Sequence, residues 1–368
     1  MRKWYSSIFL VNAALVFVIV TSSSVLAQSQ GPQHAAVLVP DSTVERAQDK
    51  GIRAHTNHLI RLQANPTPNA ISPSGETPQT IRPVYKLPLT GGSQKIAIVD
   101  AFDYPTAEND LKVFSAKFSL PLCTTANGCF KKVYASGTKP RVNCGWAQEA
   151  ALDIEWAHAM APNAKIILVE AANNSFANLF RATSQVTTGG GKGEVSMSWG
   201  GAEFSTESSY DGHFQNNNVV YFAASGDTGG VNGYPSVSPY VVSAGGTTIN
   251  RKSGVFTSET GWSGSGGGPS KYETKLSYQN NVTGTSSTKR SAPDMSFDAN
   301  PQTGVSVYDS TQCQGLSGWL VFGGTSVSSP SLAGIVNLAG RFAVNTVSEL
   351  STIYANRKNT ADFRDILS

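Results

Sequence analysis

After residue 92, short apolar runs alternate with helix-like segments, and this alternation sets narrow limits on the fold. Apolar strands joined by helices indicate an α/β fold with a mostly parallel central sheet and helices on both faces. The predicted strands cover 95–100, 165–170, 194–199, 219–224 and 240–244, and the predicted helices cover 106–118, 148–161, 176–185 and 206–216.

Polar motifs follow three of these strands directly, at 100–103, 198–201 and 225–230. In parallel sheets, ligands bind beyond the carboxyl ends of the strands. The sequence therefore predicts a functional site at this edge of the sheet.

A Gly-Gly-Thr-Ser stretch, residues 323–326, precedes an apolar small-residue run at 332–340. Glycines let a substrate backbone approach closely, and a helix N-terminus favours developing negative charge. Ser326 is therefore a candidate nucleophile, although such turns also serve as plain helix caps. Pro330 is expected within the first helical turn, where proline is tolerated.

The histidines offer no clear base for this serine. His34, His55 and His58 lie in a polar N-terminal leader, His158 lies on a predicted helix, and His213 lies in a polar stretch. None is flanked by glycines in a turn, so a Ser-His-Asp triad is disfavoured.

Carboxylates fit the role of base better. Glu149 and Asp153 are four residues apart and share one face of a largely apolar helix. Buried carboxylates need a reason, and here Glu149 would accept the Ser326 proton while Asp153 holds Glu149. Asp227 follows a strand in a Ser-Gly-Asp turn. Considered without its neighbours, Asp227 is typical of a turn. Beside a nucleophile, a protonated Asp227 could donate a hydrogen bond to an oxyanion.

The ordered motifs resemble those of the sedolisins, the serine-carboxyl peptidases, over roughly residues 80–368. The matching pieces are Glu149 to Asp153 with 161–164, 196–200, 225–227, 292–296 with 303–305, and 323–330. The resemblance implies a subtilisin-like fold and endopeptidase or tripeptidyl-peptidase activity. It implies Ser326 as nucleophile, Glu149 as base, Asp153 as its partner and Asp227 as oxyanion donor.

The resemblance also suggests less specific roles. Asp100 and Trp199 would extend the hydrogen-bond network, with a strand-end turn acid and a core aromatic as the structural alternatives. Ser198, Gly200 and Gly201 would bind a substrate backbone. The family binds one calcium ion near its C-terminus, and Asp365-Ile366 fits the start of that site. The glycine-rich remainder is missing after these residues, so a C-terminally truncated chain is expected.

The proposed chemistry predicts an acidic optimum. Glu149 must be ionised to take a proton, and Asp227 must be protonated to donate one. Unperturbed carboxyls titrate near pH ~4, so both conditions hold together only in acid.

The first residues have the pattern of an export signal. Arg2 and Lys3 precede an apolar stretch at 8–20 and a small-residue cleavage motif ending at Ala27. We therefore expect a signal peptide at 1–27, a short pro-segment or linker at 28–90 and the peptidase domain at 91–368. The family's folded pro-domain is much longer than 28–90.

Four cysteines in an exported chain favour two disulfides, with three possible pairings. Cys123–Cys129 would close a small loop and leave Cys144–Cys313. A zinc site is a weaker interpretation because the sequence has no Cys-x-x-Cys pair, and a metal site from Glu155 and His158 is weaker still.

Composition limits the partners. The net charge is only +3, 14% of the residues are charged, and the sequence has no basic cluster. We therefore expect no nucleic-acid partner, and no membrane partner after signal cleavage. We expect peptide or protein substrates and a secreted or periplasmic monomer. Two alternatives remain: an inactive sedolisin-like binding or scaffold protein, and a carbohydrate-binding protein suggested by the Gly, Ser, Thr and Asn content.

Overall fold

The computed structural model describes residues 35–63, 71–186 and 191–366, so the predicted signal peptide lies outside the described residues. Eight strands form the central sheet in the order β12-β11-β9-β7-β4-β6-β5, with β15 also paired to β11. All neighbours are parallel except β11 and β12. The strands are β4 (Lys95–Ala101), β5 (Phe130–Tyr134), β6 (Lys165–Ala171), β7 (Gly193–Met197), β9 (Val219–Ala224), β11 (Val242–Lys252), β12 (Val255–Gly261) and β15 (Met295–Asp298).

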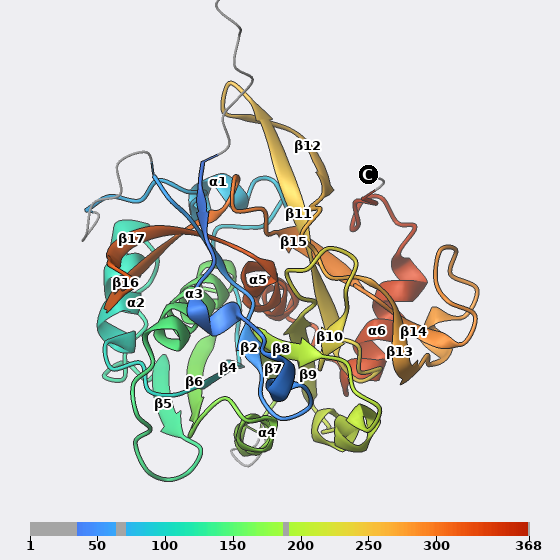
Figure 1. The fold of residues 1–368 in the computed structure, drawn as a ribbon. Coiled ribbons are helices and arrows are strands. Elements are labelled where there is room, and N and C mark those ends of the chain that lie inside the picture. The colour runs from blue at the N-terminus through green and yellow to red at the C-terminus, as the bar shows by residue number, and fades with distance from the viewer. Residues whose placement is uncertain (1–34, 64–70, 187–190, 367–368) are drawn as a thin grey trace, which may run out of the picture. The chain divides into compact units, whose positions relative to one another are not determined.

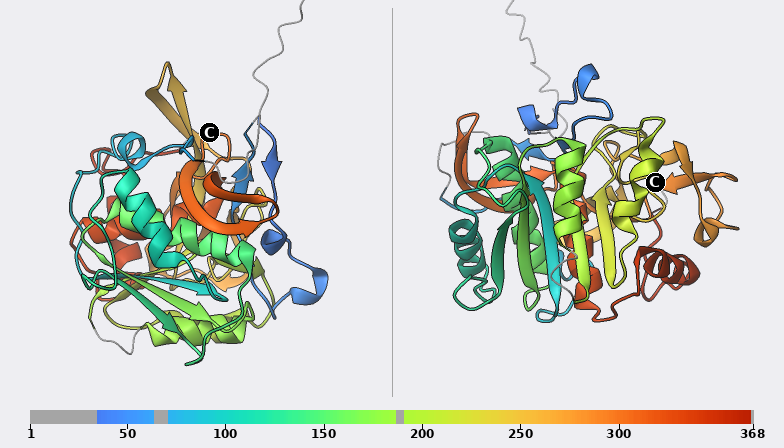
Figure 2. Two further views of the ribbon diagram at one scale, coloured as in Figure 1. Left: turned by 90° about the vertical axis from the view of Figure 1, so that its left-hand side faces the viewer. Right: turned by 90° about the horizontal axis from the view of Figure 1, so that it is seen from below.

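Helices cover both faces of this sheet, as the alternating pattern predicts (Figure 1). In β4, Ile96 and Ile98 belong to one apolar core, while Ala97 and Val99 belong to the other. Figure 2 also shows helices on both faces of the sheet. The first core contains residues of α2 (Ala107–Lys117), α3 (Cys144–Met160) and α5 (Thr325–Leu338), and the second contains residues of α4 (Phe176–Gln185).

Shorter elements surround the sheet. They are α1 (Pro78–Ile81), α6 (Thr346–Asn356), the 3-10 helices η1 (Asp41–Thr43), η2 (Ala47–Asp49), η3 (Glu207–Phe214) and η4 (Ser277–Gln279), and two antiparallel pairs, β13 (Gly268–Thr274) with β14 (Lys289–Ala292) and β16 (Val305–Cys313) with β17 (Leu316–Gly323).

The N-terminal segment 35–63 is built into the fold, which differs from the extended linker expected there. β3 (Leu59–Arg61) lies between β1 (Val37–Leu38) and β17. β2 (His55–Thr56) pairs with β8 (Trp199–Ala202), which also pairs with β10 (Gly233–Tyr234). These strands of two or three residues are held by backbone hydrogen bonds, so they leave no periodicity in the sequence.

The predicted elements after residue 92 are present, with shifted bounds. α4 and β9 have the predicted bounds. α3 begins at Cys144, before the predicted start at 148, because the Asn143 side chain accepts a hydrogen bond from Trp146 N and caps the helix. The predicted strand 194–199 is interrupted at Ser198, where β7 ends and β8 begins.

Pro330 lies in the second turn of α5, so its expected place in the first turn is wrong. The helix starts at Thr325, and proline has no N–H to donate to the carbonyl four residues earlier. That carbonyl belongs to Ser326, and the Ser198 hydroxyl lies 3.3 Å from it. The proline therefore leaves the Ser326 carbonyl free to accept from Ser198, which lies between β7 and β8.

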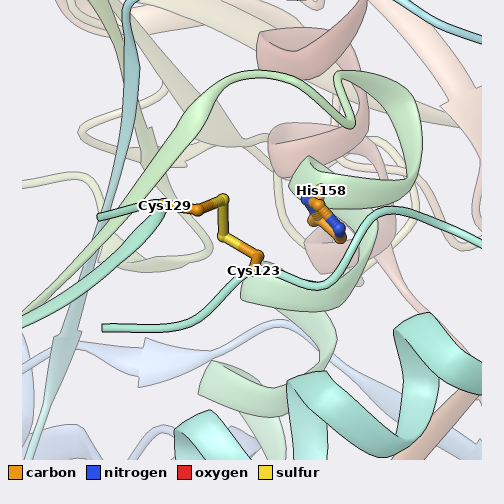
Figure 3. A group of neighbouring side chains, drawn as sticks. All are labelled: Cys123, Cys129 and His158. Carbon is orange, nitrogen blue, oxygen red and sulfur yellow. A yellow bond between two sulfur atoms is a disulfide. The ribbon is translucent and has the colours of Figure 1, made fainter. Parts of the chain in front are cut away.

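Both disulfides of the small-loop pairing are present, Cys123–Cys129 and Cys144–Cys313. His158 lies beside the first of them (Figure 3). Because metals bind thiolates and these sulfur atoms are bonded to each other, this cluster does not form a zinc site. His158 Nε2 bonds to Pro121 O and Glu155 Oε2 accepts from Tyr308 N, so these two side chains also have separate partners.

Among the helices of the described residues, none has the length and apolar character needed to cross a membrane.

Candidate active site

The predicted catalytic side chains converge where α3, α5 and the turn after β9 meet. Ser326 is the second residue of α5, Glu149 and Asp153 lie one turn apart on α3, and Asp227 follows β9. Ser326, Glu149 and Asp153 are all fully buried. The structure therefore brings together the four residues to which the sequence analysis assigned the chemistry.

Gly324 shapes the start of α5. Its φ of +92° is a conformation that side chains rarely adopt. A methyl group at this position would overlap both the Asn57 carbonyl oxygen and Asp227 Oδ2. The glycine therefore provides the backbone turn and also the space in which these two oxygens approach the helix.

The Ser326 hydroxyl bonds to backbone atoms. Its Oγ donates to Ser198 O at 3.1 Å and accepts from Asn57 N at 3.2 Å. The Ser326 backbone N donates to Asn57 O at 2.9 Å. Both the hydroxyl and the N–H of the candidate nucleophile thus contact one residue of the N-terminal segment.

Glu149 also contacts that segment. Its Oε2 lies 2.8 Å from His58 Nδ1 and accepts from Asn57 N at 3.2 Å, while Oε1 is buried without a hydrogen-bond partner. The His58 ring stacks on Phe322, with 5.3 Å between the ring centroids. A carboxylate with one unpaired oxygen in a dry site can take a proton.

Asp153 lies behind Glu149. Its Oδ1 accepts from the Ser198 hydroxyl at 2.7 Å, and its Oδ2 has no partner. Burial, with smaller contributions from Asp100 and Glu149, raises the pKa of Asp153 well above its ordinary value.

Asp227 is held by the residue before the serine. Its Oδ1 accepts from Thr325 N at 2.7 Å and from Thr325 Oγ1 at 2.9 Å. Its Oδ2 is shielded from solvent and has no partner. Burial raises the pKa of Asp227 to about 7, although the Thr325 hydrogen bonds oppose the shift. A neutral Asp227 therefore has an O–H to donate beside the Asn57 carbonyl.

The two network candidates behave differently. Asp100, near the end of β4, is buried with both oxygens unpaired, and burial followed by the Glu149 and Glu170 charges raises its pKa well above the usual range. Trp199 is a core residue whose indole N–H donates to Val99 O at 2.7 Å. Because an indole has one N–H, Trp199 does not extend the carboxyl network.

The predicted substrate strand lies beside a peptide of the same chain. Gly200 pairs with His55, Trp199 pairs with Thr56, and Ser198 O accepts from Asn57 N at 3.3 Å. Gly201 pairs instead with Tyr234 of β10. Ser198 and Gly200 thus border an extended backbone, whereas Gly201 is paired on the other side of β8.

Asn57 and His58 are the site residues that the sequence analysis missed. The N-terminal histidines were set aside because they lie in a polar leader without periodicity. No local pattern in residues 55–61 indicates pairing with a strand more than 140 residues away. Long-range strand addition is specified by the receiving edges of β8 and β17.

The calcium position predicted at Asp365 and Ile366 lies at the end of the described residues and stays a prediction. Asp365 belongs to no group of three or more Asp, Glu, His or Cys side chains among the described residues. Calcium takes six to eight oxygen ligands, so a site here needs oxygen donors besides Asp365 and the Ile366 carbonyl.

A cavity of about 780 Å³ lies at the amino ends of β4, β5 and β6, lined in part by Lys95, Lys131 and Lys165. Ser326 lies at the other edge of the sheet, near the carboxyl end of β7. This cavity does not serve the catalytic cluster.

Several known proteins are similar to this chain in sequence. No family model matches the chain. It is 38% identical over 146 residues to sedolisin of Pseudomonas sp. (strain 101), covering 37% of this chain and 23% of that one. It is 28% identical over 299 residues to kumamolisin of Bacillus sp. (strain MN-32), covering 72% and 52% respectively. Xanthomonalisin of Xanthomonas sp. (strain T-22) is 33% identical over 118 residues, covering 27% and 13%. The chain belongs to the sedolisin family.

Solved structures show the same fold as this sedolisin-family chain. Pseudomonas sedolisin, a serine-carboxyl proteinase complexed with two molecules of pseudo-iodotyrostatin, matches with a TM-score of 0.67 at 22% identity, covering 81% of this chain and 89% of that one. The fold is therefore the subtilisin-like α/β fold that the resemblance implied. The chain spans between 13% and 52% of the length of the sequence relatives it matches.

Proposed function

We propose that this sedolisin-family chain is an exported peptidase that hydrolyses peptide bonds through an acyl-enzyme on Ser326, in acid. The observation that carries the proposal is the position of the Asn57 carbonyl group. Its oxygen accepts from Ser326 N and lies against Gly324 beside Asp227 Oδ2, with the Ser326 hydroxyl next to the same residue. The Ser326 N–H and the O–H of a protonated Asp227 are donors of the kind that stabilise a developing oxyanion.

Each side chain then has one task. The Ser326 hydroxyl turns from Ser198 O toward Glu149, which accepts its proton as Oγ attacks the carbonyl carbon. Ser326 N and protonated Asp227 stabilise the oxyanion. Glu149 returns the proton to the leaving amine, and water attacks the acyl-enzyme by the reverse path. Asp153, with its raised pKa, supports the charge on Glu149.

Acid favours both required protonation states. With its pKa raised to about 7, Asp227 is protonated below that pH and can donate to the oxyanion. Glu149 accepts the proton as its carboxylate. The proposed optimum therefore lies below pH about 7.

Export and calcium are parts of the proposal that rest on the sequence. The N-terminal signal pattern and the two disulfides support an oxidising destination outside the cytoplasm. A single structural calcium at Asp365 and Ile366 would need further oxygen ligands.

Endopeptidase and tripeptidyl-peptidase activity differ in their products, which mass spectrometry of a digested peptide separates.

Matched serine variants test the function. Ser326→Ala should lower peptide hydrolysis at pH 5 by at least about 10³-fold, because it removes the nucleophile. Ser329→Ala is the control: this buried hydroxyl lies one turn further along α5 and bonds to Ser196 Oγ at 2.8 Å, away from the four catalytic groups. A covalent serine reagent should label wild type and Ser329→Ala but not Ser326→Ala. Equal hydrolysis by the two variants would rule out the nucleophile, and an unlabelled, inactive wild type would favour the binding or scaffold alternative.

A further inference from the structure

The cavity of about 780 Å³ at the amino ends of β4, β5 and β6 lies outside the catalytic cluster. Small-molecule sites usually have volumes of about 300–1,000 Å³, so this cavity has the size of a ligand site. β5 is the last strand of the central sheet, and the cavity also contacts the C-terminal end of α4 at Gln185 and Val186. The cavity therefore lies where α4 ends beside the edge of the sheet.

Four lysines line this cavity, and three of them are on neighbouring strands. Lys95 of β4 is the register partner of Lys165 of β6, so their side chains project next to each other from one face of the sheet. Lys131 of β5 lies opposite Ile167, two residues beyond Lys165, and projects from the same face at a diagonal position. The fourth is Lys192, just before β7. Because like charges on adjacent strands repel, this arrangement gains no stability from pairing within the sheet.

No negative side chain compensates these charges inside the cavity. Among the described residues that line it, none is an aspartate or a glutamate. Lys131, Lys165 and Lys192 are exposed, and none of them forms an ion pair with a carboxylate in the described part of the chain. The whole chain has a net charge of only +3, so four ammonium groups in one cavity are a local concentration of positive charge. A cleft lined by one sign of charge attracts ions of the opposite sign.

Lys95 is the half-buried member of the group. Its Nζ donates to Val186 O at 3.2 Å, just after the end of α4, and this bond orients the ammonium. Burial lowers the pKa of Lys95, because a charged ammonium is less well hydrated there. An anion in the cavity would stabilise the charged form.

The polar chemistry of the lining favours a phosphate group. None of the described lining residues is an arginine, whose planar fork matches a carboxylate. Lysine binds as a point charge with three rotatable donors, and it is a common phosphate ligand. A phosphate monoester offers three acceptor oxygens and carries about one to two negative charges, because its second pKa is about 6. Several ammonium groups can therefore share one phosphate.

The apolar part of the lining favours an aliphatic body on the same ligand. Val133, Ile167, Val169 and Val186 line the cavity, and each belongs to the second core or packs against it. No aromatic ring lies among the lining residues that the structure describes, so a planar base would find no stacking partner. Branched aliphatic side chains offer an apolar surface to a saturated chain.

We propose that this cavity binds a soluble phosphate monoester with an aliphatic body. The ammonium groups on β4, β5 and β6 hold the phosphate, and Val133 and Ile167 contact the body. The site lies at the opposite edge of the sheet from Ser326 and does not depend on the peptidase chemistry.

Titration calorimetry at pH 5 on the full chain carrying Ser326→Ala tests the site. Hexyl phosphate is the probe. Inorganic phosphate, which lacks the aliphatic body, and hexanoate, which lacks the phosphate, are the comparisons. Lys131→Gln/Lys165→Gln removes two ammonium groups from the cavity, whereas Lys112→Gln/Lys117→Gln removes the same charge from exposed positions on α2. Thermal unfolding without ligand shows that each variant is folded.

We expect hexyl phosphate to bind at least about tenfold more tightly than either comparison, because it makes both kinds of contact. Lys131→Gln/Lys165→Gln should weaken its binding at least about tenfold, because hydrogen bonds to a charged group are lost. The α2 variant should bind it as the parent chain does. Equal weakening in both double variants, or no binding at millimolar concentration, would overturn the site. Equally tight binding of hexanoate or inorganic phosphate would overturn the ligand class.

Vesicles containing phosphatidic acid separate a soluble ester from a lipid headgroup of the same chemistry. We expect the chain not to sediment with them, because the apolar side chains of this site are half-buried or buried and cannot enter a bilayer. Sedimentation of the parent but not of Lys131→Gln/Lys165→Gln, without binding of hexyl phosphate, would assign these lysines to a membrane surface and overturn the soluble ligand.

Discussion

Asp227 Oδ1 accepts two hydrogen bonds from Thr325, one from the backbone N at 2.7 Å and one from the hydroxyl at 2.9 Å. This double contact fixes the carboxyl against the first turn of α5 and leaves Oδ2 as its free atom. Gly324 keeps the space in front of Oδ2 clear of side chains. One oxygen of Asp227 thus anchors the side chain, and the other is available to a substrate carbonyl.

Asp227 should set the alkaline limit of peptide hydrolysis. Its pKa of about 7 means that the donating O–H is lost as pH rises through 7. Asp227→Ala should lower kcat/KM at pH 5 by about 10²–10³-fold, because it removes an oxyanion donor. Asp227→Asn keeps an acceptor for Thr325 and an N–H donor, so it should retain part of the activity and lose the decline near pH 7.

The measurement is a pH profile of kcat/KM on a fluorogenic peptide, recorded after each chain reaches a constant rate. An Asp227→Asn profile that still declines near pH 7 would assign that limit to another group. Full activity in Asp227→Ala would remove Asp227 from the chemistry.

The folded chain should be more stable in mild acid than at pH 8. Burial raises the pKa of both Glu170 and Glu194 to about 8, from an ordinary value of 4.5. Between these values the unfolded chain binds fewer protons than the folded chain, so the free energy of unfolding falls as pH rises. We expect the thermal midpoint of Ser326→Ala, which avoids self-digestion, to drop by about 5–10 °C from pH 5 to pH 8.

Glu194→Gln in the same background provides the control. Glu194 Oε2 accepts from Asn337 Nδ2 at 2.7 Å, and a glutamine oxygen can replace it without a charge. The substitution should raise the midpoint at pH 8 and leave it nearly unchanged at pH 5. A midpoint that rises from pH 5 to pH 8 in the parent would contradict the assigned shifts.

The sequence predicted that the four side chains would lie together because their motifs are local and stand on regular elements. Glu149 and Asp153 are one helical turn apart, and Ser326 follows a glycine turn that only a few backbone paths allow. The position of residues 55–61 could not be predicted in this way. It depends on pairing with β8 and β17, which brings His58 to Glu149, 91 residues away in the sequence. The role suggested for Trp199 was wrong because indole direction depends on packing: the ring turns into the core beneath β8, toward Val99 O.

The two disulfides should contribute unequally to stability. Cys144–Cys313 joins the first residue of α3 to the end of β16 across 169 residues, whereas Cys123–Cys129 spans six. In the chain-entropy model, the longer loop restrains the unfolded chain by about 2–3 kcal/mol more. Cys144→Ser/Cys313→Ser should therefore lower the free energy of unfolding more than Cys123→Ser/Cys129→Ser does.

Denaturant unfolding of the two double variants in the Ser326→Ala background measures this difference. Because each variant loses one disulfide and gains two serines, the comparison cancels much of the side-chain effect. An equal loss in both would show that native-state packing outweighs the entropy of the unfolded chain at these sites.

Gly324→Ala should abolish activity through geometry alone, with every proposed catalytic group still present. Any side chain at this position meets the Asn57 carbonyl oxygen and Asp227 Oδ2, and it also requires a φ of +92°. Gly340→Ala separates the two effects, because Gly340 also has a positive φ, +68°, but no atom lies within 4 Å of its would-be methyl group. Backbone strain alone should cost Gly340→Ala about 1 kcal/mol and leave hydrolysis intact. Gly324→Ala should lose more stability than this, together with peptide hydrolysis. If Gly324→Ala hydrolysed peptides as well as Gly340→Ala does, a substrate carbonyl would not lie between Gly324 and Asp227, and the oxyanion assignment would be wrong.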